Sequence, residues 1–279
     1  MSTLKKEVIF VDAHVHIYDC FDENALFDSA YNNFSNEASK QGLDEEFTGL
    51  LLLTETINDE WFNQTYQSAQ NNEAKTHSEQ LWQIHDTPDK KVLKAIKPSV
   101  EGGKDKVLYI LAGRQVNTSE GLELLALATE KSITNGLTIS AALEKAHEND
   151  AIPVIPWAVG KWLGKRGAIL SAVLEKEETS ALCLGDNSGR PVFWKNPSHF
   201  KQAKTLNRPI LPGSDPLPLP GESKKVGSFG FMLEGKLTES SLSSDLKKLL
   251  RDKTTQITAY GELEKPVRFF TNQIKLRLL

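Results

Sequence analysis

Two histidines, one residue apart, follow the first apolar run of the chain. Val8–Val11 is β-branched and aromatic and predicts a buried strand, and Asp12–His16 comes directly after it. Because side chains two residues apart on a strand point to the same side, His14 and His16 can aim both imidazoles into one cavity. Neutral imidazoles bind Zn²⁺, Mn²⁺ or Fe²⁺, and Asp12 can orient one of them. The segment therefore predicts two metal ligands; the alternative is a pair of exposed loop histidines.

Two aspartates follow later apolar runs. Asp215 lies in Pro212–Pro216, and Asp186 lies in Leu184–Pro191. A carboxylate at the end of a strand can ligate a metal or take a proton from a metal-bound water. We therefore expect both aspartates to be catalytic, although each segment also has the composition of an ordinary polar turn.

Three cations are candidates for binding an anionic substrate. Lys161 and Lys165 lie in Pro156–Gly167, a segment with three glycines and two tryptophans, and Arg190 closes the turn after Asp186. Glycine permits close backbone approach, and guanidinium groups bind phosphate or carboxylate. The alternative is a basic surface loop anchored by buried indoles.

The elements that must position these residues alternate along the chain. Apolar runs of strand length, such as Gly49–Leu53 and Val107–Leu111, alternate with helical patterns such as Ser140–Asn149. This alternation predicts parallel strands joined by crossover helices. We expect one domain over residues 1–279, a single (β/α) barrel that is TIM-like or a distorted seven-stranded barrel, with its site at the carboxyl ends of the strands.

Composition limits the partners that we expect. A net charge of −4 and a pI of 5.9 argue against a nucleic-acid partner, so we expect none. The two cysteines, Cys20 and Cys183, form no C-x-x-C pair, and we find no signal peptide and no apolar run long enough to cross a membrane. We expect a cytoplasmic protein without membrane contact; its oligomeric state is left open.

The order of the motifs resembles the PHP family (polymerase and histidinol phosphatase domain) within the metal-dependent hydrolases. Asp12–His16 matches the D-x-H-x-H of that family, and Gly213–Asp215 matches its Gly-Ser-Asp. Leu53–Thr56 looks like its Thr-Asp-His segment, with Glu55 as a conservative replacement. Gln115 stands where the bridging glutamate would be. The resemblance implies a distorted β/α barrel, a metal cluster and phosphoester hydrolysis.

The chain departs from the family at several metal ligands. Ile155 and Leu217 stand where the family has histidine. Apolar replacements remove ligands outright, so a full cluster is not expected. The resemblance then implies one divalent ion, Zn, Mn or Fe, on His14, His16 and Asp215, with Glu55 as a further candidate.

Two functions are consistent with these residues. The first is a metal-dependent hydrolase, of phosphoesterase or amidohydrolase type, that uses metal-bound water on a small anionic substrate. The alternative is a catalytically inactive PHP-like barrel, without metal, that binds a ligand or a partner. The strand-end position of His14, His16 and Asp215 favours the hydrolase; the missing ligands favour the alternative.

Overall fold

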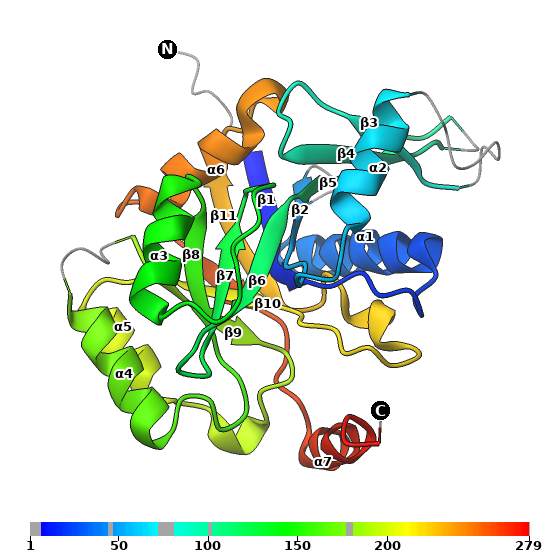
Figure 1. Cartoon of the computed structure of the whole chain (residues 1–279). Helices are drawn as coiled ribbons and strands as arrows, with labels where there is room; N and C mark the ends of the chain where they lie inside the picture. The colour runs from blue at the N-terminus through cyan, green and yellow to red at the C-terminus, as the bar shows by residue number, and fades with distance from the viewer. Residues whose placement is uncertain (1–6, 44–46, 72–80, 100–101, 177–180, 279) are drawn as a thin grey trace.

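A computed structural model of the chain describes residues 7–43, 47–71, 81–99, 102–176 and 181–278. Figure 1 shows strands in the centre of the molecule, with helices on either side. The strands are β1 (Glu7–Val15), β2 (Phe47–Leu53), β3 (Gln83–Asp86), β4 (Val92–Lys97), β5 (Lys106–Leu111), β6 (Gly113–Asn117), β7 (Glu123–Leu127), β8 (Ile152–Pro156), β9 (Cys183–Asn187), β10 (Ile210–Gly213), β11 (Gly230–Gly235) and β12 (Thr258–Tyr260). The α-helices are α1 (Glu23–Lys40), α2 (Trp61–Gln70), α3 (Ile139–Glu148), α4 (Gly164–Glu175), α5 (Ser198–Thr205), α6 (Leu242–Arg251) and α7 (Pro266–Lys275).

The strands form two separate sheets. One has seven strands in the order β12-β11-β1-β2-β5-β4-β3, and the other has five in the order β10-β9-β8-β7-β6. Within the described residues neither sheet closes into a barrel, so the expectation of a single (β/α) barrel, TIM-like or distorted, was wrong. Parallel pairing was expected throughout, but β11, β3, β4, β6 and β7 pair antiparallel with a neighbour.

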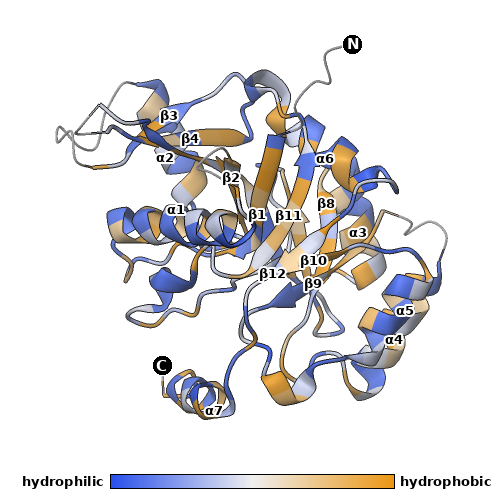
Figure 2. Ribbon diagram, turned by 180° about the vertical axis from the view of Figure 1, so that it is seen from behind, coloured by the Kyte–Doolittle hydropathy of each residue, from blue (hydrophilic) through white to orange (hydrophobic). Residues whose placement is uncertain are grey.

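Alternating side chains distribute the core over layers. On β1, Ile9 and Val11 point toward the core shared by the two sheets and α6, whereas Phe10 points toward α1. The outer face of the five-stranded sheet packs against α3, α4 and α5. Both faces of the central strands are therefore apolar, which explains their near-continuous hydrophobic runs. Figure 2 shows these strands as the most hydrophobic part of the fold.

Several predicted elements are confirmed. Predicted strands at Val8–Val11, Gly49–Leu53 and Val107–Leu111 correspond to β1, β2 and β5, and the predicted helix Ser140–Asn149 corresponds to α3. Thr138 caps α3 by accepting a hydrogen bond from the amide of Ala141. Among the described helices, none combines the length and apolar character needed to cross a bilayer.

The carboxyl ends of β1 and β10 lie side by side, and this brings His14 and Asp215 close together. The amide of Asp215 donates to the carbonyl of His14 at 2.8 Å. A Cβ at Gly213 would collide with the backbone of His14, so only glycine permits this approach. Asp215 itself has a φ of +47°, a left-handed conformation uncommon for residues other than glycine. This backbone turns its side chain back toward β1.

Candidate metal centre

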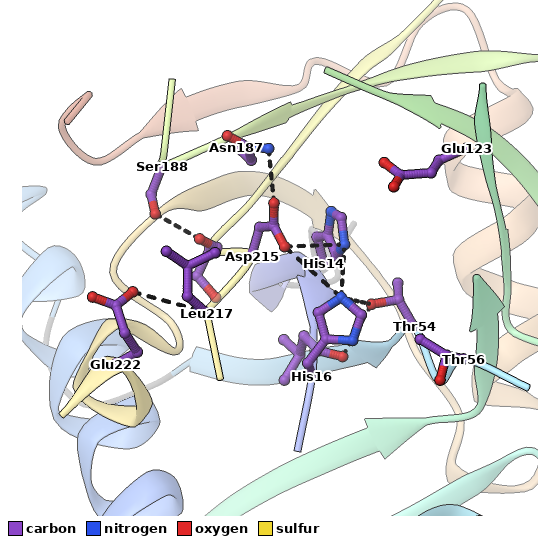
Figure 3. A network of polar contacts seen from close by, with 12 residues as sticks. His14, His16, Thr54, Thr56, Glu123, Asn187, Ser188, Asp215, Leu217 and Glu222 are labelled. Atoms are coloured by element: carbon purple, nitrogen blue, oxygen red, sulfur yellow. Dashed lines mark hydrogen bonds and ion pairs between the residues drawn. The ribbon is translucent and has the colours of Figure 1, made fainter. Parts of the chain in front are cut away.

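Two imidazoles and one carboxylate converge where β1 and β10 end. The Nε2 atoms of His14 and His16 lie 3.2 Å apart. Asp215 Oδ1 lies 3.4 Å from Nε2 of His14 and 3.8 Å from Nε2 of His16. Figure 3 shows the three side chains pointing toward one another. The sequence prediction that these groups share one site agrees with this geometry.

The spacing of the three donors fits a single metal ion. Three ligands at about 2.0–2.1 Å from a tetrahedral Zn²⁺ would lie about 3.3 Å from one another. The observed separations of 3.2, 3.4 and 3.8 Å are close to that value. Two nitrogens and one oxygen also form a donor set that suits Zn²⁺, Mn²⁺ or Fe²⁺. The residues present therefore fit the predicted divalent ion.

Burial keeps both imidazoles in the form that binds metal. His14 and His16 are buried, and this burial lowers the pKa of each to about 4. Neutral imidazole is the ligand form, so no proton has to leave at neutral pH. Burial raises the pKa of Asp215 above its usual range, while His16 opposes that shift. The Nδ1 atom of His16 is buried and has no hydrogen-bond partner among the described residues.

Asp12 holds the backbone around the centre. Its Oδ1 accepts from the amides of Ser214 at 2.7 Å and His14 at 3.3 Å, and its Oδ2 accepts from the amide of Gly227 at 2.8 Å. Burial raises the pKa of Asp12 to about 7 against the effect of these bonds. The sequence suggested that Asp12 orients an imidazole; in the structure it instead binds the backbone beside His14 and Asp215 and that of the turn before β11.

Asn187 at the end of β9 orients the carboxylate ligand. Its Nδ2 donates to Asp215 Oδ2 and to the carbonyl of Trp157, both at 2.8 Å. The bond occupies one oxygen of Asp215 and leaves the other facing the histidines (Figure 3). Sequence analysis missed this residue, although its position beside Asp186 at a strand end was a usable signal.

The donors open into a cavity of about 340 Å³. Glu123 and Lys161 form an ion pair in its wall, and Lys225 contributes a second cation, which pairs with Glu264 at 2.8 Å. Helix α7 supplies part of the wall through Phe269, Asn272 and Gln273, and Leu276, directly after the helix, also lines it. Lys161 is thus a predicted substrate-binding residue that reaches the cavity, whereas Glu123 and Lys225 were not predicted to take part.

The other predicted site residues lie outside this cavity. Asp186 and Arg190 form a bidentate ion pair at 2.6 and 2.7 Å, and the same guanidinium binds two backbone carbonyls of the following loop. Lys165 is exposed at the start of α4. Glu55 pairs with Arg114 at 2.9 Å and accepts from the amide of Phe62 at 2.7 Å. The structure brings none of these four predicted residues to the three converging ligands.

Comparisons with known proteins give a likeness of fold. No protein-family model matches the chain, and no curated protein matches it. The crystal structure of PsfC from Pseudomonas syringae PB-5123 aligns with 98% of this chain and 100% of its own, with a TM-score of 0.53 at 14% identity. At that identity the match shows a related fold and not a shared activity. Membership of the PHP family stays a prediction.

Two structures of endonuclease Q also match. The lesion-specific enzyme from Pyrococcus furiosus aligns with 90% of this chain at 12% identity and a TM-score of 0.47. An endonuclease Q complex with a 27-mer duplex aligns with 88% at 12% identity and a TM-score of 0.43. This chain spans 57% of either enzyme's length. Scores this low support no statement about activity.

The exclusion of a nucleic-acid partner needs correction. That expectation was based on net charge alone; among the structural neighbours, endonuclease Q was solved with a duplex substrate bound. A net charge averages over all faces of a molecule and says nothing of any one of them. We therefore no longer exclude nucleic acid as a partner.

Proposed function

We propose that this protein is a hydrolase that depends on one divalent metal ion bound by His14, His16 and Asp215. The observation that carries the proposal is the convergence of these three donors at separations that one ion can bridge. A divalent ion supplies Lewis-acid activation of water and of the bond to be cleaved. The alternative, a protein that binds a ligand without metal, has no comparable support from the donor geometry.

The charges around the cavity favour an anionic substrate. Three carboxylates, from Asp215, Glu123 and Glu264, and two ammonium groups, from Lys161 and Lys225, line the space. A divalent ion beside the neutral imidazoles would leave the wall with a small positive surplus. A substrate anion that displaces the carboxylate of Glu123 from its ion pair with Lys161 would bind Lys161 directly. We assign Lys161 to substrate binding on this basis.

The chain's own residues have distinct roles in this proposal. Asn187 fixes the orientation of Asp215, and Asp12 fixes the loops beside it. The indole of Trp157 and the side chain of Leu217 line the cavity and exclude water from one side. Asp186, Arg190, Lys165 and Glu55 have structural contacts elsewhere, and the proposal gives them no catalytic role.

Elemental analysis tests the metal centre. Protein purified without chelator or affinity tag should contain about one Zn, Mn or Fe ion per chain. A His14→Gln/His16→Gln double variant should lose the ion. A His85→Gln/His147→Gln double variant, which changes two exposed histidines outside the site, should keep it.

Turnover tests the hydrolase separately. Metal-loaded protein should cleave p-nitrophenyl phosphate, bis-p-nitrophenyl phosphate or a p-nitroanilide amide, and the His14→Gln/His16→Gln variant should not. Bound metal without turnover of any of the three would refute the hydrolase and leave the metal centre intact. Absence of metal from the wild-type chain would refute both, in favour of a binding protein.

A further inference from the structure

A second hollow, of about 750 Å³, lies among the amino-terminal ends of three strands. Its wall includes Ala151–Pro153 at the start of β8, Cys183 at the start of β9 and Asn207–Pro209 just before β10. Because β8, β9 and β10 are parallel, this hollow and the candidate metal centre lie at opposite ends of the same strands. Figure 1 likewise shows α6, which lines the hollow, and α7, which lines the first cavity, at opposite ends of the molecule.

Among the charged side chains in the wall of this hollow, most are basic. Among the residues that the structure describes, five cations line it together with one carboxylate, that of Asp252; the cations are Lys204, Arg208, Lys247, Arg251 and Lys253. The carboxylate of Asp252 accepts from the amide and hydroxyl of Thr254 at 2.8 and 2.7 Å, so it is engaged in its own turn. A chain with a net charge of −4 thus concentrates positive charge in one concave place.

Two of these cations, together with the neighbouring Lys91, lie near one carboxylate, that of Asp150. Lys247 Nζ lies 2.8 Å from Asp150 Oδ2, and Arg251 lies 3.5 Å from Asp150 Oδ1. Lys91 Nζ lies 3.7 Å from the same carboxylate. One carboxylate cannot neutralise three cations, so a positive surplus remains beside the hollow. The side chain of Lys247 is only 2% exposed, which makes an additional anionic ligand more favourable there.

The remaining cations differ in mobility. Lys204 and Lys253 are exposed and have no ion-pair partner within the described part of the chain. Arg208 is buried, and its guanidinium donates to the carbonyls of Leu174 and Lys176 at 3.1 and 3.0 Å. The hollow therefore combines a fixed guanidinium with two ammonium groups that can move onto a ligand.

We propose that this hollow binds a small phosphorylated organic molecule. Arginine and lysine together suit the several oxygens of a phosphate group, and the volume is that of a small-ligand pocket. Ile152, Pro153, Leu250 and Ile257 offer apolar surface for the rest of such a molecule. Binding to a nucleic-acid backbone needs a basic stripe that follows the strand, whereas these cations surround a concavity.

Calorimetric titration of metal-free protein with phenyl phosphate and with inorganic phosphate tests this site. Removing the metal takes away the proposed ion of the other cavity, and a Lys161→Gln variant, which removes the cation assigned to substrate binding there, should give the same result as wild type. We expect phenyl phosphate to bind more tightly than inorganic phosphate, because only the former reaches the apolar surface. A Lys204→Gln/Lys253→Gln variant should bind at least tenfold more weakly, as expected for two lost charge-assisted contacts.

A charge-matched variant separates the site from general attraction. Lys40→Gln/Lys224→Gln removes two exposed cations from α1 and the turn at residues 222–225, and it should bind like wild type. Equal weakening in both double variants would overturn the proposal. So would absence of phosphate binding by the wild-type chain, or binding of a DNA duplex through Lys204 and Lys253 without binding of phenyl phosphate.

Discussion

Two buried histidines, His14 and His16, should make the stability of the fold depend on pH. The pKa of His14 and of His16 is lowered to about 4, below the value of about 6.5 expected in the unfolded chain. Between these values the unfolded state binds protons that the folded state does not. These two histidines should therefore contribute fully to the stability of the metal-free fold above pH 6.5, and their contribution should be lost as the pH falls toward 4.

The size of this loss can be measured by urea unfolding from pH 7 to pH 4.5. Each buried histidine contributes a slope of up to about 1.4 kcal/mol per pH unit. The His14→Gln/His16→Gln variant should show a shallower slope than wild type, and His85→Gln should show the wild-type slope because its side chain is exposed. Parallel curves for wild type and the double variant would contradict the assignment.

Asn187 should control metal affinity without contacting the metal. Asn187→Ala removes the hydrogen bond that holds Asp215 Oδ2, so the carboxylate becomes free to rotate. Loss of such an outer partner typically weakens metal binding 10- to 100-fold. Competition with a chromophoric chelator measures this change, and Asn63→Ala, outside the cavity, serves as control. Unchanged affinity in Asn187→Ala would show that the bond does not position the ligand.

Sequence could predict the three side chains that converge but not the partners of the other charged residues. His14 and His16 were predictable because they come after an apolar run and are two residues apart, which is the side-chain period of a strand. Asp215 was predictable because it follows another apolar run. Asp186 lies near the end of β9, yet Arg190 occupies both of its oxygens. Residue types alone do not show that the turn places the guanidinium of Arg190 against the carboxylate of Asp186.

At the scale of elements, one buried ion pair connects three segments. Glu55, just after β2, pairs with Arg114 on β6 and also accepts from the amide of Phe62 in the first turn of α2. Arg114 further donates to the carbonyl of Asp59 at 3.0 Å. Helix α2 has no side-chain cap of its own, so Glu55 replaces one.

Arg114→Ala should lower the free energy of unfolding by about 3 kcal/mol, because it leaves the carboxylate of Glu55 buried without its cation. Lys145→Ala, which breaks a half-exposed pair with Glu148, should cost much less, because solvent screens an exposed pair. Urea unfolding measures both changes. Equal costs would mean that burial of the pair is unimportant.

Glu55, which the sequence suggested as a metal ligand, has a structural role in this ion pair, and a substitution can distinguish the two roles. Glu55→Gln should keep the wild-type metal content, since its carboxylate faces Arg114 and not the centre. Elemental analysis of that variant decides the matter, and a loss of metal would restore Glu55 to the ligand set.

Apolar runs predicted where strands lie better than they predicted which strands pair and in which direction. β1, β2 and β5 are continuous apolar runs and were predicted, whereas β6 carries Arg114 and Gln115 and was not predicted. Parallel and antiparallel strands buried on both faces have the same composition here, so direction could not be inferred from it. Barrel closure depends on which edges meet, and pairing between distant segments sets that property.

At the scale of the whole molecule, the centre lies where the two sheets meet. His14 lies at the end of β1 in the seven-stranded sheet, His16 directly follows that strand, and Asp215 follows β10 of the five-stranded sheet. An ion bound by all three would therefore link the sheets. The prediction of one domain over residues 1–279 is consistent with such a link and remains a prediction.

Metal should consequently raise the stability of the whole fold. An ion present at 100 times its dissociation constant adds about 2.7 kcal/mol, which corresponds to a rise in Tm of about 5 °C for a chain of this size. Calorimetry of chelator-treated protein with and without added Zn²⁺ or Mn²⁺ measures this rise, which the His14→Gln/His16→Gln variant should lack. Hydrogen exchange should show the added protection on both sides of the junction, in β1 and in β10, because the ligands come from both sheets. Protection confined to β1 would mean that the two histidines bind the ion without Asp215, and that the sheets are not linked through it.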